Sequence, residues 1–134
     1  IEMNKWYDVK IVVSPMKSEF YIDGKMILSY VSQPMPLQFI HSGYDEDNGE
    51  LIVKVVNAAD SVYSTTIRVD GAEEIAKSGK IISLTASSAK DENSYEEPRK
   101  IYPHESDYGG FGKKFDFDFP PFSYTVLRIK AKIK

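Results

Sequence analysis

Two aspartates, Asp116 and Asp118, stand two residues apart in an alternating apolar segment near the end of the chain. Glycoside hydrolases work with two carboxyl groups about 5–9.5 Å apart. Residues i and i+2 of a strand are about 6.6 Å apart, so the distance suits that chemistry. The two side chains leave the same face in parallel, however, whereas catalytic carboxyls must flank the scissile bond. We therefore interpret the pair as a solvated sheet face and predict no catalytic residue from it.

Asp45, Asp47 and Glu50 form an acidic turn around Asn48 and Gly49. Carboxylate and amide oxygens at alternate positions are the ligands that calcium takes from an EF-hand loop. The match to that motif is partial and breaks early, so whether Asp45 and Asp47 bind calcium stays open at this point.

No other motif predicts a metal or a cofactor. The histidines are two, His41 and His104, far apart in the sequence, and there is no cysteine, so a zinc ligand set is absent. The sequence also has no Gly-x-Ser-x-Gly nucleophile elbow and no glycine-rich phosphate loop. We expect no catalytic residue and no cofactor in this chain.

The final segment carries a basic stripe at every second residue, which consists of Arg128, Lys130, Lys132 and Lys134. A solvated sheet face explains it most simply. If the last two strands form a hairpin, Asp116 and Asp118 lie opposite these cations. Alternatively, Pro120 and Pro121 carry the chain from one sheet to another and the pairing does not form.

Three tyrosines, Tyr95, Tyr102 and Tyr108, lie in a polar stretch at residues 87–112. An exposed tyrosine can stack on a sugar face and bond its hydroxyl groups. The alternative is that these rings hold the long segment onto the body of the domain. They are the candidate sugar-contact residues.

Length and composition exclude several classes of protein. The chain has 134 residues, and a (β/α)₈ barrel needs about 250. A hydrophobic content of 42% is enough for a buried core, and the net charge of −3 argues against nucleic acid as a partner. No apolar run approaches the roughly 20 residues of a membrane span. Because the chain begins at Ile1 in strand-like sequence, we expect it to be a piece of a longer protein.

Alternating apolar residues predict strands along almost the whole chain. They are expected at 6–13, 19–22, 25–30, 37–43, 51–57, 62–69, 81–86, 115–119 and 127–133. Asp23 and Gly24 predict a tight hairpin turn, and residues 72–77 predict one helical turn. Residues 51–57 are apolar on both faces except for Lys54, which is typical of a central or covered strand. The pattern predicts an all-β, antiparallel β-sandwich of jelly-roll type with almost no helix.

An ordered series of segments resembles the C-terminal β-sandwich domain of α-L-arabinofuranosidases of glycoside hydrolase family 51. The segments are 49–57 (GELIVKVVN), 82–86 (ISLTA), 91–94 (DENS), 98–103 (PRKIYP) and 119–128 (FPPFSYTVLR). Each is weak alone, but the order is fairly specific.

The first part of the chain resembles a different fold. Residues 6–10 (WYDVK) and 21–25 (YIDGK) are similar to the closing hairpin of concanavalin-like, laminin-G-type sandwiches. Residues 1–33 are therefore predicted to be the tail of such a module, and 34–134 the C-terminal sandwich domain. Pro34 and Pro36 stand at the join. The alternative of one compact unit over 1–134 stays open.

The resemblance implies a non-catalytic accessory domain of an α-L-arabinofuranosidase. In that family two glutamates on a (β/α)₈ barrel do the chemistry, and this chain does not contain the barrel. The implied partners are the catalytic barrel of the same parent chain and arabinose-containing polysaccharide, with no nucleic acid and no membrane. The alternative function is a carbohydrate-binding module that uses the loop tyrosines. An extracytoplasmic location, periplasmic or secreted, is implied by the family alone.

Overall fold

The computed structural model describes residues 2–133, so Lys134 of the basic stripe lies outside it. Within these residues every strand pairing is antiparallel and there is no helix, which confirms the predicted all-β class. It follows that no helix in this range could cross a membrane. The chain divides into two compact units, Ile1–Pro36 and Leu37–Lys134.

The first unit is a three-stranded sheet in the order β1-β2-β3. Its strands are β1 (Val9–Ser14), β2 (Lys17–Ile22) and β3 (Lys25–Val31). Asp23 (φ 49°) and Gly24 (φ 74°) both have positive φ between β2 and β3, as a type I′ turn requires. The hairpin predicted from this dipeptide is therefore confirmed.

One face of this sheet is apolar. The cross-strand register places Ile11, Phe20 and Leu28 in one row across the three strands. Ile11 is 65% exposed and Leu28 is 62% exposed, so the row is open. The opposite face is mixed, with an ion pair between Lys17 and Glu19 beside the exposed side chains of Val12 and Val31. An open row of large apolar side chains on a sheet is typically covered by a second layer.

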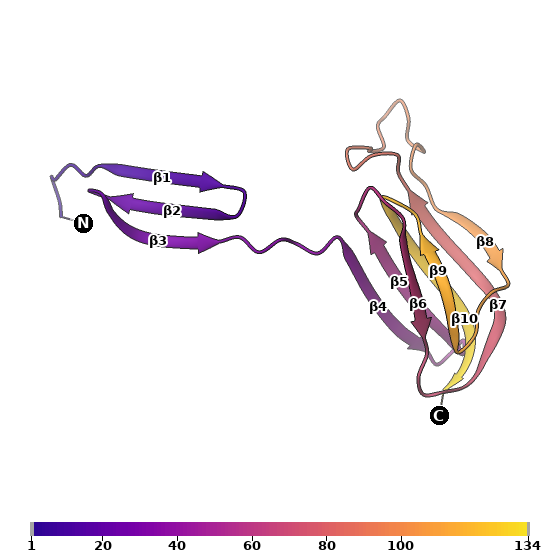
Figure 1. Ribbon diagram of the computed structural model, residues 1–134. Helices are drawn as coiled ribbons and strands as arrows, with labels where there is room; N and C mark the ends of the chain where they lie inside the picture. Colours follow the sequence, from indigo (N-terminus) through magenta and orange to yellow (C-terminus); the bar gives the residue numbers. More distant parts are fainter. Residues whose placement is uncertain (1, 134) are drawn as a thin grey trace. The chain divides into compact units, whose positions relative to one another are not determined.

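The second unit has two sheets (Figure 1). The larger has five strands in the order β4-β5-β10-β7-β8, and the smaller pairs β6 with β9. The strands of the larger sheet are β4 (Gln38–Asp45), β5 (Glu50–Asn57), β10 (Ser123–Ile133), β7 (Ala72–Thr85) and β8 (His104–Tyr108). The smaller sheet consists of β6 (Tyr63–Arg68) and β9 (Lys114–Phe119).

The core lies between these two sheets. Val55, Leu127 and Ile129 of the larger sheet are at most 1% exposed and pack with Phe115 and Phe119 of the smaller one. As predicted, 51–57 forms an inner strand, β5, with β4 on one side and β10 on the other. Its second face stays partly open to solvent, because Ile52 and Val56 are only half-buried.

The predicted helical turn at 72–77 is wrong. These residues begin the long strand β7, in which Glu74 lies opposite Lys132 and Ile75 opposite Ala131. A six-residue helix is marginal because its nucleation costs more than its few hydrogen bonds return. Pairing with β10 instead gives most of these backbone groups a partner, with a bulge between Ile129 and Ala131.

The polar stretch 87–112 contains a short strand that is absent from the list of expected strands. The strand is β8 (His104–Tyr108), which pairs with β7. The rest of the connection from β7 to β8 extends beyond the strand ends (Figure 1).

Candidate functional site

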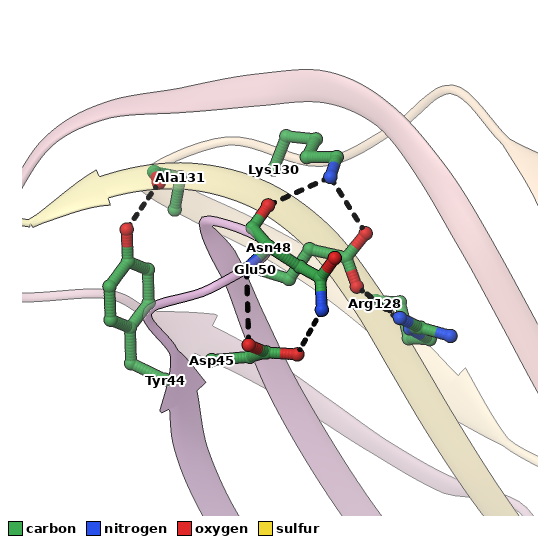
Figure 2. Close-up of polar contacts among 7 residues, drawn as sticks. All are labelled: Tyr44, Asp45, Asn48, Glu50, Arg128, Lys130 and Ala131. Atoms are coloured by element: carbon green, nitrogen blue, oxygen red, sulfur yellow. Dashed lines mark hydrogen bonds and ion pairs between the residues drawn. The ribbon is translucent and has the colours of Figure 1, made fainter.

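Hydrogen bonds and ion pairs hold the acidic turn after β4 in place (Figure 2). Glu50 accepts a hydrogen bond from Arg128 Nε (2.8 Å) and pairs with Lys130 Nζ (3.1 Å). The hydrogen bonds from Arg128 and Lys130 hold the pKa of Glu50 below its ordinary value. Asp45 accepts hydrogen bonds from the backbone and side-chain nitrogens of Asn48, which lower the pKa of Asp45.

These contacts bear directly on the calcium hypothesis. Lys130 Nζ also donates to the carbonyl of Asn48 (2.8 Å), so the cation occupies oxygens that a metal would need. No group of three or more His, Cys, Asp or Glu side chains in residues 2–133 is arranged to hold a metal. His41 on β4 and His104 on β8 lie at opposite edges of the larger sheet. The turn is thus a set of polar contacts that joins β4, β5 and β10.

The carboxylate pair and the basic stripe lie in different sheets. Asp116 and Asp118 are exposed on β9, which pairs with β6, and Asp116 accepts a hydrogen bond from Thr66. Arg128 and Lys132 belong to β10 in the larger sheet. Of the two sequence alternatives, the one in which Pro120 and Pro121 carry the chain between sheets is therefore correct, and the cross-strand ion pairs do not form.

The three candidate tyrosines occupy different settings. Tyr95 is 96% exposed in the loop between β7 and β8. Tyr102 is 37% exposed; its ring centroid lies 4.1 Å from that of His104, with the rings tilted at 45°, and the Arg99 guanidinium lies over its face. Tyr108 is half-buried.

The ring of Tyr108 lies 4.7 Å from that of Phe111 and 5.5 Å from that of Phe117. It thus holds the end of the polar stretch onto the core. Only Tyr95 and Tyr102 present open ring surface, and Tyr95 makes no ring contact within the described residues.

Side-chain hydrogen bonds order the loop that carries Tyr95. Asp91 accepts from the backbone N–H groups of Ser87 (2.8 Å) and Ser88 (3.0 Å) and pairs with Lys100 (3.0 Å). The Lys100 contact, followed by these backbone donors, lowers the pKa of Asp91. Asn93 both accepts from and donates to the backbone of Ile101. The loop is exposed, yet the hydrogen bonds and the ion pair of Asp91 and Asn93 hold its two strands of chain together.

An apolar hollow of about 370 Å³ lies beneath this loop. Leu84, Val56 and Tyr124 line it from the sheet, and Ala89 and Ile101 line it from the loop. This hollow could not be predicted from the sequence, because its two walls are far apart along the chain. Alternation in β5 and β10 could have indicated the outward apolar residues, but not the loop over them.

Asn57 is a further buried polar residue that was not predicted from the sequence. Its side chain is fully buried and donates to the carbonyls of Ser61 (2.8 Å) and Pro120 (2.9 Å). Its Oδ1 accepts from Gln38 Nε2 (3.2 Å) and from the backbone of Ala59 (3.2 Å). The sequence feature that could have indicated this role is its position, since Asn57 is a polar residue at the end of an apolar strand and precedes a turn.

The second unit thus belongs to the class of antiparallel β-sandwiches, with its core between the five-stranded and the two-stranded sheet. No known family profile matches the chain. The extracellular exo-α-L-arabinofuranosidase of Streptomyces chartreusis is 29% identical over 134 residues, which are 98% of this chain and 16% of that protein.

Solved structures show the same fold. An arabinose-bound structure of the α-L-arabinofuranosidase MgGH51 has a TM-score of 0.66 at 24% identity, over 78% of this chain and 17% of that one. The α-L-arabinofuranosidase of Thermotoga maritima, in an arabinose complex, has a TM-score of 0.64 at 19% identity. The match covers 92% of this chain and 24% of that one. The predicted resemblance to an arabinofuranosidase domain is confirmed. The chain spans about a sixth to a quarter of the length of the proteins it matches.

Proposed function

We propose that residues 37–134 are a non-catalytic accessory domain of an α-L-arabinofuranosidase, and that they support a catalytic barrel outside this chain. The observation that carries the proposal is the match of nearly the whole chain to a small part of one such enzyme. The internally paired carboxylates agree with it, because Glu50 and Asp91 are engaged by cations and amides rather than free for acid–base work.

Activity measurements on two polypeptides test this proposal. The 134-residue chain should leave an aryl α-L-arabinofuranoside unhydrolysed, whereas the longer polypeptide that contains it should release the aryl group. Deleting residues 37–134 from the longer polypeptide should lower its melting temperature. Hydrolysis by the purified 134-residue chain would contradict the proposal, and so would a longer polypeptide without this activity.

We further propose that the first unit is the end of a concanavalin-like sandwich. The open apolar face around Ile11, Phe20 and Leu28 supports this, since a three-stranded sheet of this kind needs a second layer to cover it. In the 134-residue chain this face should bind the dye ANS. Leu28→Lys should reduce the fluorescence strongly, whereas Ser29→Lys, on the opposite face and across from Glu19, should leave it unchanged. Equal effects of the two variants would count against a built inner face.

Carbohydrate binding is the second candidate function, because the ordered loop presents Tyr95 fully to solvent. Tyr95 and Tyr102 are the sugar contacts in this proposal, and Tyr108 contributes by fixing the loop. Titration of the 134-residue chain with arabinan, followed by calorimetry, tests it. Saturable binding that Tyr95→Ala abolishes would support the proposal, and no heat of binding at millimolar saccharide would refute it.

An extracytoplasmic location is also proposed, since the Streptomyces relative is described as extracellular. Detecting the longer polypeptide in the culture medium or periplasm tests it.

A further inference from the structure

A row of four apolar side chains crosses the outward face of the larger sheet. Phe39 of β4 lies opposite Val56 of β5, which lies opposite Tyr124 of β10, which lies opposite Leu84 of β7. Their chain neighbours Val55 and Thr125 point the other way and are 1% exposed. We call these four residues the apolar row.

The apolar row is not covered. Phe39 is 45% exposed and Tyr124 is 37% exposed, while Val56 and Leu84 are half-buried. The hollow of about 370 Å³ is lined by three residues of the row, Val56, Tyr124 and Leu84, and the loop after β7 forms its far wall. The loop is held by the Asp91–Lys100 ion pair and the two Asn93 hydrogen bonds, so this wall exists before any partner binds.

Charged residues occupy the other half of the same face. Arg128 pairs with Glu50, and Lys80 pairs with Glu105 and Asp107 (2.9 Å). The face therefore has an apolar half, which contains the apolar row, and a charged half, and protein–protein interfaces combine these two kinds of surface. A saccharide would need free polar groups to orient it, yet Asp91, the acid that lines the hollow, already accepts from Ser87, Ser88 and Lys100.

We propose that the apolar row and the hollow beside it are the docking surface for a neighbouring domain of the same longer chain. The proposal rests on the accessory-domain function above and identifies the face that performs it. The relative that matches 98% of this chain has about five-sixths of its length outside the match, so a covalently linked partner of sufficient size is at hand. A linked domain pays no bimolecular association cost, so a modest apolar area suffices to hold it.

Thiol accessibility tests the proposal, because residues 1–134 contain no cysteine. Tyr124→Cys and Phe39→Cys place a thiol on the apolar row. Ser64→Cys, on the exposed face of β6, is the matched control. Each variant is made in the 134-residue chain and in the longer polypeptide, whose other cysteines are replaced by serine, and its folding is checked by circular dichroism. The rate of reaction with a thiol reagent is then measured.

In the 134-residue chain all three thiols should react at similar rates. In the longer polypeptide, those at positions 124 and 39 should react at least about tenfold more slowly, with Ser64→Cys unchanged. Equal rates in the two polypeptides would overturn the proposal. So would protection of Cys variants in the 134-residue chain by arabino-oligosaccharide, or by a dimer seen in sedimentation. The arabinofuranosidase assay tests the proposed function independently of the thiol rates. Failure of the docking proposal therefore does not refute the proposed function, and failure of the proposed function is seen in the activity assay alone.

Discussion

The side-chain amide of Asn57 donates a hydrogen bond of 3.2 Å to the backbone carbonyl of Phe119. Asn57 is the last residue of β5, and Phe119 is the last residue of β9. Because β5 and β9 belong to different sheets, this contact joins the two layers of the second unit. Both residues are fully buried.

Replacing Asn57 should therefore destabilise the second unit. Asn57→Ala leaves the buried carbonyls of Phe119 and Pro120 without this donor, and we expect a loss of about 3 kcal/mol in the free energy of unfolding. Urea unfolding followed by fluorescence measures it. Asn93→Ala, which removes an amide from the exposed loop, is the control and should cost less than about 1 kcal/mol. A similar loss in both variants would show that Asn57 does not link the sheets.

The Glu50 cluster predicts a pH dependence of stability. The pKa of Glu50 in the folded chain lies below its ordinary value of 4.5, chiefly through the hydrogen bond from Arg128. A depressed carboxyl pKa contributes stability above the unfolded value, and this is lost as the pH falls through the folded value. At pH 7 Glu50→Gln should be less stable than the unchanged chain, and the difference should shrink from about pH 4.5 downward.

Chemical unfolding at a series of pH values checks this prediction. Glu46→Gln alters an exposed carboxylate in the same turn that makes none of the contacts in Figure 2, so it should show no such difference. A Glu50→Gln effect that stays constant from pH 7 to pH 3 would assign the loss to packing rather than charge.

Gly79 and Gly43 form a matched pair in the larger sheet. A Cβ on Gly79 would lie 2.3 Å from the carbonyl oxygen of Arg128 and 3.1 Å from the ring of Phe111, whereas nothing lies within 4 Å of one on Gly43. Gly79→Ala should lower the free energy of unfolding by about 3 kcal/mol, because backbone must move. Gly43→Ala should be neutral or slightly stabilising. Thermal melts compare the two, and equal melting temperatures would mean that β7 shifts freely.

Substitution of the loop tyrosines Tyr108 and Tyr95 should affect the free energy of unfolding to different extents. Tyr108→Ala removes a ring that packs on Phe111 and Phe117, so we expect a loss of about 2–4 kcal/mol. Tyr95→Ala should change stability by less than about 0.5 kcal/mol, since the ring is 96% exposed. Denaturant titration distinguishes them. A large stability loss in Tyr95→Ala would mean that its binding phenotype cannot be assigned to sugar contact.

Local patterns in the sequence were enough to predict most of the strands and the all-β class. Alternation marks residues 115–119, whose phenylalanines turn inward and aspartates outward, because successive side chains of a strand point to opposite faces. The Asp23–Gly24 turn could be predicted for the same local reason, since few residue pairs accept two positive φ angles. Segment order was also enough to predict the resemblance that the arabinofuranosidase matches confirm.

Tertiary contacts decided the rest. Residues 72–77 are a strand because β10 offers partners for their backbone, and no local propensity contains that information. Glu50 is held in ion pairs because Arg128 and Lys130, about eighty residues away along the chain, lie beside it. The apolar row exists only once four separate strands are in register. Local sequence determines which faces a strand has, but pairing and register, set by the whole chain, determine what each face meets.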